Sequence, residues 1–239
     1  MRKKNTDRIE FEKQTLFKLN SRWDVKPITD GHKELIDSID NCTIILCSGP
    51  AGSGKTHIAL GKGIEGLRKE KFKQVLLIRP LQECGRNIGA LPGEKDEKLS
   101  VHMLAFTDLF NKFMTSKEAE EWIKNQNLVI DSPEFIRGRT FNETYIVLDE
   151  AQNLTYTQLK MLMTRIGKDS KMVIVGDAQQ TDLPKKFWFG YDSCEFTAKV
   201  PLAEIMDRLT DVDDKIEVID LTEEDIVRHD LIAKLCKIL

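Results

Sequence analysis

The chain carries, at residues 49–56, the stretch Gly49-Pro50-Ala51-Gly52-Ser53-Gly54-Lys55-Thr56. The apolar run 43–47 precedes it and a segment alternating Ile, Ala, Leu and Gly follows it, so the local order is strand, tight loop and helix. The stretch fits G-x-x-x-x-G-K-[ST] at every fixed position, the pattern of a loop that cradles phosphate. The sequence therefore predicts a site for a nucleoside triphosphate.

Each fixed position of this loop has a chemical reason. Gly52 and Gly54 let the backbone turn its N–H groups inward around phosphate oxygens. Lys55 places a positive charge on the β and γ phosphates, Thr56 offers a hydroxyl to Mg²⁺, and the N-terminus of the following helix adds positive potential. The predicted nucleotide-binding set is Gly49, Pro50, Ala51, Gly52, Ser53, Gly54, Lys55, Thr56 and His57.

The composition is that of a globular domain without a strong overall charge. The 239 residues are 41% apolar and carry a formal net charge of −3, which excludes a globally basic nucleic-acid binder. The five cysteines show no paired C-x-x-C spacing, which argues against a disulfide framework and a zinc site. Because no signal peptide, lipidation motif or long apolar run is visible, we expect a soluble cytoplasmic protein without membrane contact.

The chain divides into a basic arm and one larger domain. Residues 1–29 are expected to form a partly ordered arm, and residues 30–239 an α/β domain. Within that domain we expect helices at 30–39, 56–70, 98–114 and 116–126, a buried strand at 75–78 and a long functional loop at 81–97.

Residues 203–225 hold ten carboxylates against two basic groups and are expected to form a solvated acidic face. The aromatic and apolar side chains of the helix at 98–114 are expected to be core rather than a stacking platform: Phe106, Leu109, Phe110 and Phe113.

A second stretch, residues 145–150, is an apolar strand that ends in two carboxylates, Asp149 and Glu150. In a phosphate-loop enzyme the strand-end Asp holds Mg²⁺, usually through water, and an adjacent Glu can orient and deprotonate the attacking water. The pair therefore predicts a metal site at Thr56 and Asp149, and hydrolysis by Glu150. The next helix begins with a capping box at Thr155 and is expected to end at Gly167.

A third apolar strand, residues 172–175, leads to the polar cluster 176–180. Gln180 is either a sensor of the γ-phosphate or part of a surface turn, and the residues alone leave both open. The recurrence of strand, helix and strand predicts a three-layer α/β fold, a parallel sheet with helices on both faces and ligands at the carboxyl ends of the strands. Lys55, Asp149 and Gln180 all fall at that edge.

Together these motifs resemble the PhoH family of P-loop ATPases, which have a single RecA-like domain related to superfamily 1 helicases. The resemblance covers roughly residues 28–239 and rests on the phosphate loop and on the following short motifs: Arg79-Pro80, 91–94, 137–140, Leu148-Asp149-Glu150-Ala151-Gln152-Asn153, 164–167, 176–180, 182–184 and 227–229. It implies an ATPase that uses ATP and Mg²⁺, linked to RNA or other nucleic-acid metabolism and often ring-forming. Helicase activity is possible.

The sequence departs from the family pattern at two places. His32 stands where the family usually has a Gln that reads adenine, so the resemblance places His32 at the nucleotide but makes strict preference for ATP doubtful. In the long loop after Arg79-Pro80, this chain has Glu83-Cys84-Gly85-Arg86 where related proteins have Glu followed by Ala-Gly-Glu. A basic residue, Arg86, thus stands where the family has an acidic one.

The arginine that completes the hydrolytic site is not fixed by the sequence. Arg79 and Arg165 could reach phosphate in the same subunit or form structural ion pairs. Two-domain helicases supply this charge from a second domain that we do not expect here, so a neighbouring subunit of a ring, first guessed as a hexamer, could provide it. We favour Arg228, then Arg137 or Arg139, which gives a predicted catalytic set of Lys55, Glu150, Gln180 and Arg228.

Contact with single-stranded RNA or DNA is predicted for the local basic segments. Residues 1–26 carry eight basic against four acidic groups, a net charge of +4, and Arg137 and Arg139 flank a glycine. The residues assigned to this contact are Arg2, Lys3, Lys4, Arg137 and Arg139. The alternatives are that the arm is only a solubilising tail, and that the protein is a nucleotide-dependent kinase or switch acting on a small substrate.

Overall fold

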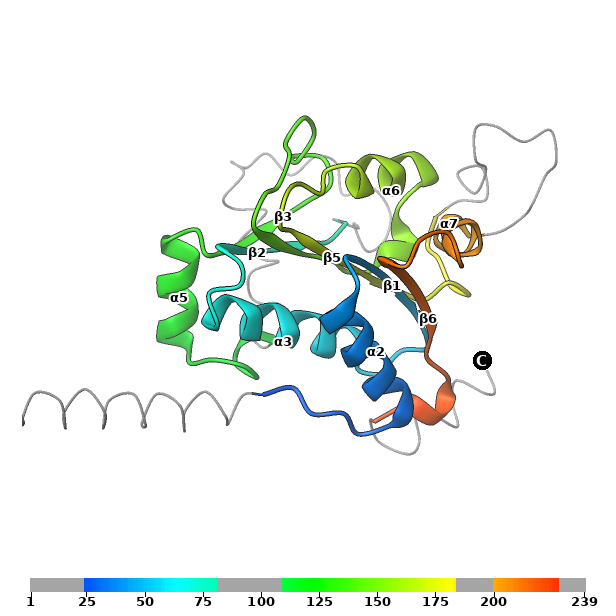
Figure 1. Ribbon diagram of the computed structural model, residues 1–239, viewed down its shortest axis with the longest axis horizontal. Coiled ribbons are helices and arrows are strands. Elements are labelled where there is room, and N and C mark those ends of the chain that lie inside the picture. The colour runs from blue at the N-terminus through cyan, green and yellow to red at the C-terminus, as the bar shows by residue number, and fades with distance from the viewer. Residues whose placement is uncertain (1–23, 81–108, 184–199, 228–239) are drawn as a thin grey trace, which may run out of the picture.

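The computed structural model describes residues 24–80, 109–183 and 200–227 of the chain. Among these residues six strands form one sheet, and every neighbouring pair is parallel. The strands, in their order across the sheet (Figure 1), are β3 (Leu128–Asp131), β2 (Gln74–Ile78), β4 (Thr144–Leu148), β5 (Lys171–Gly176), β1 (Ile44–Ser48) and β6 (Ile216–Asp220).

Helices cover both faces of the sheet, so the expected three-layer α/β architecture is confirmed. Figure 1 shows α2 (Asp30–Asn41) and α3 (Lys55–Arg68) beneath the sheet, and α6 (Tyr156–Met163) and α7 (Pro201–Leu209) above it. The helix α5 (Ser116–Lys124) packs beside β3 and joins the core of α2 and α3. Two short 3₁₀ turns, η1 (Ala151–Asn153) and η3 (Glu223–Asp225), complete the described elements.

The apolar strands feed two separate cores because successive side chains point to opposite faces. In β4, Tyr145 and Val147 belong to the core between the sheet and the helices α2, α3 and α5. Ile146 and Leu148 belong to the core between the sheet and the helices α6 and α7. A strand buried on both faces needs a continuous apolar run. This is why residues 75–78, 145–148 and 172–175 could be recognised from the sequence.

The helix that follows the two carboxylates is shorter than expected. Its capping box is confirmed, since Thr155 and Gln158 bond each other's backbone N–H groups. The helix ends at Met163, however, and not at Gly167. Residues 165–167 instead pair with Phe141, which donates to the carbonyl of Arg165 at 3.0 Å and accepts from Gly167 at 2.7 Å. Tertiary pairing therefore takes these residues out of the helix, and Arg165 lies beyond it.

Sequence reasoning missed three elements, namely β3, β6 and α7. The interpretation of residues 203–225 as a solvated acidic face is wrong in part, because this segment contains α7 and a strand that pairs with β1. Its Asp225 is only 6% exposed and accepts a hydrogen bond from Thr29 Oγ1 at 2.5 Å. Strand β6 reads Ile-Glu-Val-Ile-Asp, so acidic residues interrupt its apolar ones, and this is a weaker signal than a continuous apolar run.

Several sequence predictions lie outside the described residues: the arm up to residue 23, the loop at 81–97, and most of the helix at 98–114 with Phe106. Of that helix's apolar side chains that are described, Phe110 and Phe113 are buried in the core, as predicted, and Leu109 packs against it. Val25 also packs on this core. Within the described ranges, no helix combines the length and the apolar character needed to cross a membrane.

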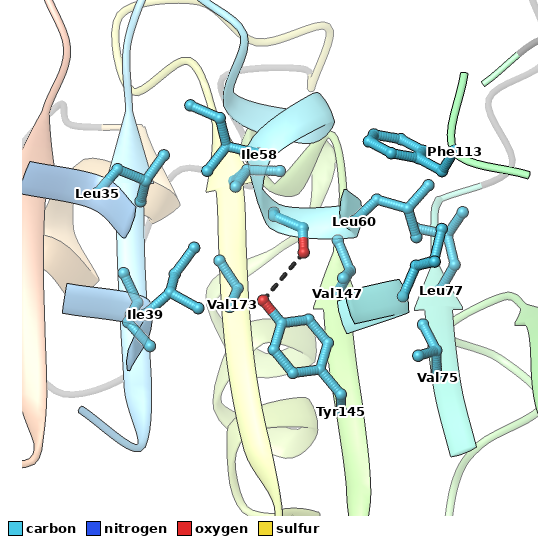
Figure 2. Close-up of a cluster of buried hydrophobic side chains, with 14 of the residues drawn as sticks. Leu35, Ile39, Ile58, Leu60, Val75, Leu77, Phe113, Tyr145, Val147 and Val173 are labelled. Atoms are coloured by element: carbon cyan, nitrogen blue, oxygen red, sulfur yellow. Dashed lines mark hydrogen bonds between the residues drawn. The ribbon is translucent and has the colours of Figure 1, made fainter. Parts of the chain in front are cut away.

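Tyr145 fixes the position of α3, the helix that follows the phosphate loop. Figure 2 shows its ring among the apolar side chains of this core, with its hydroxyl donating a hydrogen bond to the carbonyl of Ala59 in α3, at 2.9 Å. Gly63 allows this close approach, because a Cβ there would lie 2.5 Å from the Tyr145 ring. Since Tyr145 lies in β4, the strand that leads to Asp149, it ties the loop helix to the strand that delivers the carboxylates.

We expect Tyr145→Phe to lower the free energy of unfolding by about 1 kcal/mol, the usual contribution of one buried hydrogen bond. The measurement is urea denaturation followed by circular dichroism. Tyr156→Phe is the matched control: this hydroxyl makes no hydrogen bond among the described residues, so its loss should change stability by less than about 0.5 kcal/mol. Equal stability of wild type and Tyr145→Phe would show that the bond to Ala59 does not hold α3 in place.

Candidate functional site

A cleft of about 640 Å³ opens at the carboxyl edge of the sheet, a volume typical of small-molecule sites. It collects residues that are far apart in the sequence because parallel strands end at the same edge. The phosphate loop, the end of β4 and the end of β5 all contribute. The lining is formed by Lys26, Ile28, His32, Ala51, Gly52, Gly54, Lys55, Thr56, His57, Ile58, Leu109, Lys112, Asp149, Glu150, Gln152, Gly176, Asp177, Gln180 and Val227.

The phosphate loop has the backbone that its glycines predicted. Gly52 and Gly54 have φ angles of 90° and 79°, a left-handed region that strongly favours glycine. At Gly54 a Cβ would also come within 3.3 Å of the ring of His32. The residue next to Gly54 is Lys55, the first residue of α3, so the positive end of the helix faces the cleft.

Lys55 lies within the curve of the loop. Its Nζ donates to the carbonyls of Gly49 at 2.5 Å and Pro50 at 2.8 Å, and approaches Ser53 Oγ at 3.3 Å. Burial lowers the pKa of Lys55, and the nearby Cys47, Asp177 and carboxylates oppose this shift. The ammonium group is therefore held among oxygen atoms at the position where phosphate oxygens would compete for it.

Thr56 and Asp149 form the candidate metal site. Thr56 Oγ1 donates to Asp149 Oδ1 at 2.8 Å, and the Asp149 side chain is 5% exposed. A hydroxyl and a carboxylate are ligands that suit Mg²⁺. No group of three or more His, Cys, Asp or Glu side chains gathers as a metal site in the described part of the chain. A cation between Thr56 and Asp149 would then take its remaining ligands from phosphate and water, which is the usual coordination of Mg²⁺ in such sites.

Glu150 stands beside this pair in an unusual backbone conformation. Its φ and ψ are 54° and 41°, a left-handed conformation that costs a non-glycine residue about 1–3 kcal/mol and is often found at functional sites. Its carboxylate receives a hydrogen bond on each oxygen, from Arg79 Nη2 at 3.1 Å and from Gln152 Nε2 at 2.7 Å. The side chain is 40% exposed and lines the cleft, so solvent water can reach it.

Gln152 is a site residue whose role sequence reasoning missed. While its Nε2 donates to Glu150, its Oε1 accepts from the backbone N–H of Asp177 at 3.1 Å. The carbonyl of Gln152 also accepts from Thr181 Oγ1 at 2.7 Å. Gln152 therefore connects the end of β4 to the segment after β5. The available signal was its place two residues after Glu150, but the contact with Asp177 depends on strand order.

Gln180 lies in a turn after β5, where its N–H donates to the carbonyl of Asp177 at 3.2 Å. It is exposed and lines the cleft. The surface-turn interpretation of Gln180 is thus confirmed, and its role as a sensor of the γ-phosphate stays a prediction.

The two histidines assigned to nucleotide binding have different surroundings. His32 is 2% exposed: its Nδ1 accepts from the N–H of Ile28 at 3.4 Å, so its Nε2 carries the proton that bonds to the carbonyl of Ser53 at 2.9 Å. Both ring nitrogens thus contact protein backbone, and His32 supports the loop. His57 is exposed at the cleft and lies against the ring of Phe113, with centroids 4.5 Å apart. Desolvation and the neighbouring Lys112 and His32 lower the pKa of His57 and so favour its neutral ring.

Three arginines considered in the sequence analysis, Arg137, Arg139 and Arg165, do not line the cleft. Arg137 and Arg139 are exposed in the loop after β3, and neither lines the cleft. Arg139 pairs with Asp131 at 3.5 Å and stacks over Phe141 at 4.8 Å from the ring centroid. Arg165 donates from Nε to the carbonyl of Met161 at 3.1 Å. The other residues assigned to catalysis or nucleic acid lie outside the described residues: Arg228, Arg2, Lys3 and Lys4.

We expect Asp149→Asn to raise the melting temperature at pH 7 in buffer without divalent cations. Burial raises the pKa of Asp149 above its usual 3.8, despite the opposing effects of Arg79 and Thr56, so the ionised carboxylate destabilises the fold. The asparagine oxygen can still accept from Thr56. Because the group protonates as pH falls through its raised folded pKa toward 3.8, the difference between mutant and wild type should shrink over that range.

Asp37→Asn, at an exposed position on α2, is the matched control. It should change the melting temperature little at pH 7 or at lower pH. An Asp149→Asn protein that is less stable than wild type at pH 7 would show that the bonds to Thr56 and Arg79 outweigh the burial of the charge.

The family described as PhoH-like protein matches residues 24–239. The PhoH-like protein of Bacillus subtilis (strain 168) is 36% identical over 207 residues, which cover 87% of this chain and 61% of that protein. The PhoH-like protein of Mycobacterium tuberculosis (strain ATCC 25618 / H37Rv) is 36% identical over 211 residues, which cover 88% of this chain and 56% of that protein. The chain thus spans little more than half the length of these curated relatives.

The protein PhoH of Escherichia coli (strain K12) is 27% identical over 213 residues, which cover 87% of this chain and 57% of that protein. A solved structure, the DUF1998 helicase MrfA bound to DNA, aligns at 11% identity with a TM-score of 0.43, covering 80% of this chain and 25% of that chain. The family match includes the phosphate loop, the two carboxylates and the polar turn after β5, which are the elements that build the cleft. The chain therefore belongs to the PhoH-like protein family.

Proposed function

We propose that this chain binds ATP with Mg²⁺ and hydrolyses it. The observation that carries the proposal is the meeting of three functions in one cleft: a lysine within a phosphate loop, a hydroxyl–carboxylate pair suited to a cation, and a solvent-accessible glutamate beside them. Simple nucleotide binding would need the loop and the cation pair, but not Glu150. The glutamate therefore favours hydrolysis over binding alone.

Each residue has a defined part in the reaction. The loop N–H groups and Lys55 bind the phosphates, and Thr56 with Asp149 would hold Mg²⁺, which supplies positive charge to the phosphate oxygens. Glu150 orients a water molecule and takes its proton as the water oxygen bonds to the γ-phosphorus. The bond from that phosphorus to the β–γ bridging oxygen breaks, and ADP and phosphate leave. Gln152 keeps Glu150 in register with the turn that carries Gln180.

We expect Lys55→Ala to lose triphosphate binding, because it removes the charge at the centre of the loop. Glu150→Gln should still bind ATP with Mg²⁺ but hydrolyse it at least ~100-fold more slowly, the scale for loss of a general base. Binding is measured by calorimetry and turnover by phosphate release. Lys69→Ala, an exposed lysine just beyond the same helix, is the control and should behave as wild type. An equal loss of binding in Lys55→Ala and Glu150→Gln would contradict the assignment.

We further propose that the ATPase acts on single-stranded RNA or DNA. It is supported by the net charge of +4 over residues 1–26 and by the exposed loop after β3. In that loop Arg137 is exposed and makes no ion pair or hydrogen bond with the described residues. Arg139 is partly neutralised by Asp131. The contact would be made with the phosphate backbone and would not depend on base sequence.

Affinity for labelled single-stranded RNA should fall with salt at a log–log slope of about −0.7 per phosphate contact, so four to six contacts give roughly −3 to −4. Deletion of residues 2–8, or Arg137→Ala, should flatten this slope without abolishing basal ATP hydrolysis. Arg208→Ala, which removes an exposed arginine paired with Glu204 on α7, serves as control. A salt-independent signal, or no binding below ~100 μM at low salt, would refute the contact.

The proposed assembly is a ring of identical subunits, and a hexamer is the expected size. A head-to-tail interface repeats until it closes, and a neighbour could supply Arg228 to the γ-phosphate. Arg228 lies outside the described residues, although the residue before it, Val227, lines the cleft. Sedimentation velocity with Mg²⁺ and a non-hydrolysable ATP analogue tests the assembly, and a monomer under these conditions would rule it out.

A further inference from the structure

Strand pairing holds the backbone of Arg79 next to the two carboxylates. β2 and β4 are parallel neighbours with Ile78 opposite Leu148, and the N–H of Asp149 donates to the carbonyl of Ile78 at 2.9 Å. On its other side the N–H of Arg79 donates to the carbonyl of Asp131 at 3.2 Å. The residue that follows β2 is thus fixed between the ends of β3 and β4. This register, and not a flexible loop, places the Arg79 side chain at the carboxylates.

The Arg79 guanidinium contacts both acids but favours Glu150. Its Nη2 lies 3.1 Å from Glu150 Oε1, and its Nη1 lies 3.8 Å from Asp149 Oδ2. The Arg79 and Glu150 side chains are 37% and 40% exposed. Exposed ion pairs of this kind shift an equilibrium by only about 1.4- to 5-fold. The contact with Glu150 can therefore be broken readily by a competing anion.

This contact bears directly on the ability of Glu150 to act as a base. A carboxylate oxygen takes a proton from water through the lone pairs that also accept hydrogen bonds. In the structure Arg79 donates to Oε1, and Gln152 donates to Oε2. Loss of the Arg79 contact would free Oε1 for water, while the bond to the buried Gln152 would keep the carboxylate in place.

We propose that Arg79 alternates between Glu150 and the γ-phosphate, so that triphosphate binding transfers the guanidinium from the base to the substrate. This rests on the proposed ATPase function and names a second role at the same site. Phosphate oxygens accept from a guanidinium in a bidentate, charge-assisted manner and compete well with one carboxylate oxygen. The transfer frees Glu150 to take the proton of the attacking water. It also places a positive charge in the same subunit where negative charge develops.

The test is a double-mutant cycle on binding of a non-hydrolysable ATP analogue with Mg²⁺, using wild type, Arg79→Ala, Glu150→Gln and the double variant. Glu150→Gln removes the competitor for Arg79 as well as a negative charge, so it should tighten binding in the wild-type background. In the Arg79→Ala background only the charge effect remains. The tightening should therefore be about two- to fivefold smaller there.

Turnover gives an independent measurement. Arg79→Ala should lower kcat at least about tenfold, a modest part of what an arginine at a transferred phosphoryl group contributes, and Arg79→Lys should recover part of the loss. Arg208→Ala, an exposed arginine paired with Glu204 on α7, is the matched control and should leave both affinity and kcat within about twofold of wild type. If Arg79→Ala fails to fold, the cycle of Arg79→Gln with Glu150→Gln carries the same test, because glutamine is polar but has no charge.

The outcomes separate this inference from the proposed function. Equal tightening by Glu150→Gln in both backgrounds, or a kcat of Arg79→Ala within twofold of wild type, would show that Arg79 is a static structural partner and would overturn the inference. Wild type that neither binds nor hydrolyses ATP would instead overturn the proposed function. If wild type hydrolyses ATP, and Glu150→Gln tightens binding more in the wild-type background than in the Arg79→Ala background, the inference and the proposed function are both supported.

Discussion

The parallel register of the sheet is the constraint on which the site depends. Ser48 lies opposite Gly176, and Leu148 lies opposite Ile174 and Ile78. The strands β1, β2, β4 and β5 therefore end at nearly the same level, and the first residue after each strand enters a shared space. The described side chains at this edge are brought together by the backbone positions of the strand ends. Their meeting follows from backbone hydrogen bonds that are buried between two apolar cores.

Burial of charge at this edge gives the site its chemistry and makes it costly for the fold. Asp149 is nearly fully buried, with a raised pKa, and Lys55 is partly buried, with a lowered pKa, both mainly through desolvation. Such groups are stabilised most by a partner of opposite charge. A cation held by Asp149 and phosphates around Lys55 would provide those partners. The same desolvation that disfavours the charges in the protein alone favours the ligands that neutralise them.

A second set of contacts controls how the reactive groups are presented. His32 bonds the loop carbonyl of Ser53, Gln152 bonds both Glu150 and the backbone of Asp177, and Arg79 bonds Glu150. These side chains connect α2, η1 and the residue after β2 to the phosphate loop and to Glu150. Supporting contacts of this kind set the orientation of reactive groups on which rate depends. His32 illustrates the point, because its ring nitrogens serve the loop although it lines the cleft.

The sequence by itself determined the phosphate loop, the carboxylates at the end of β4, and the three-layer α/β fold. These features depend on local patterns, namely fixed glycines before Lys55 and continuous apolar runs, which can be read from the order of neighbouring residues alone. Only the tertiary structure decided that β6 joins the sheet, that the helix after Glu150 stops at Met163, and that Gln152 and Arg79 both bind Glu150. The place of β6, the end of the helix and the contact of Arg79 with Glu150 result from pairing between segments distant in sequence, where the energy depends on strand order and register. Gln152 lies only two residues from Glu150, but its second bond, to the backbone of Asp177, also depends on strand order.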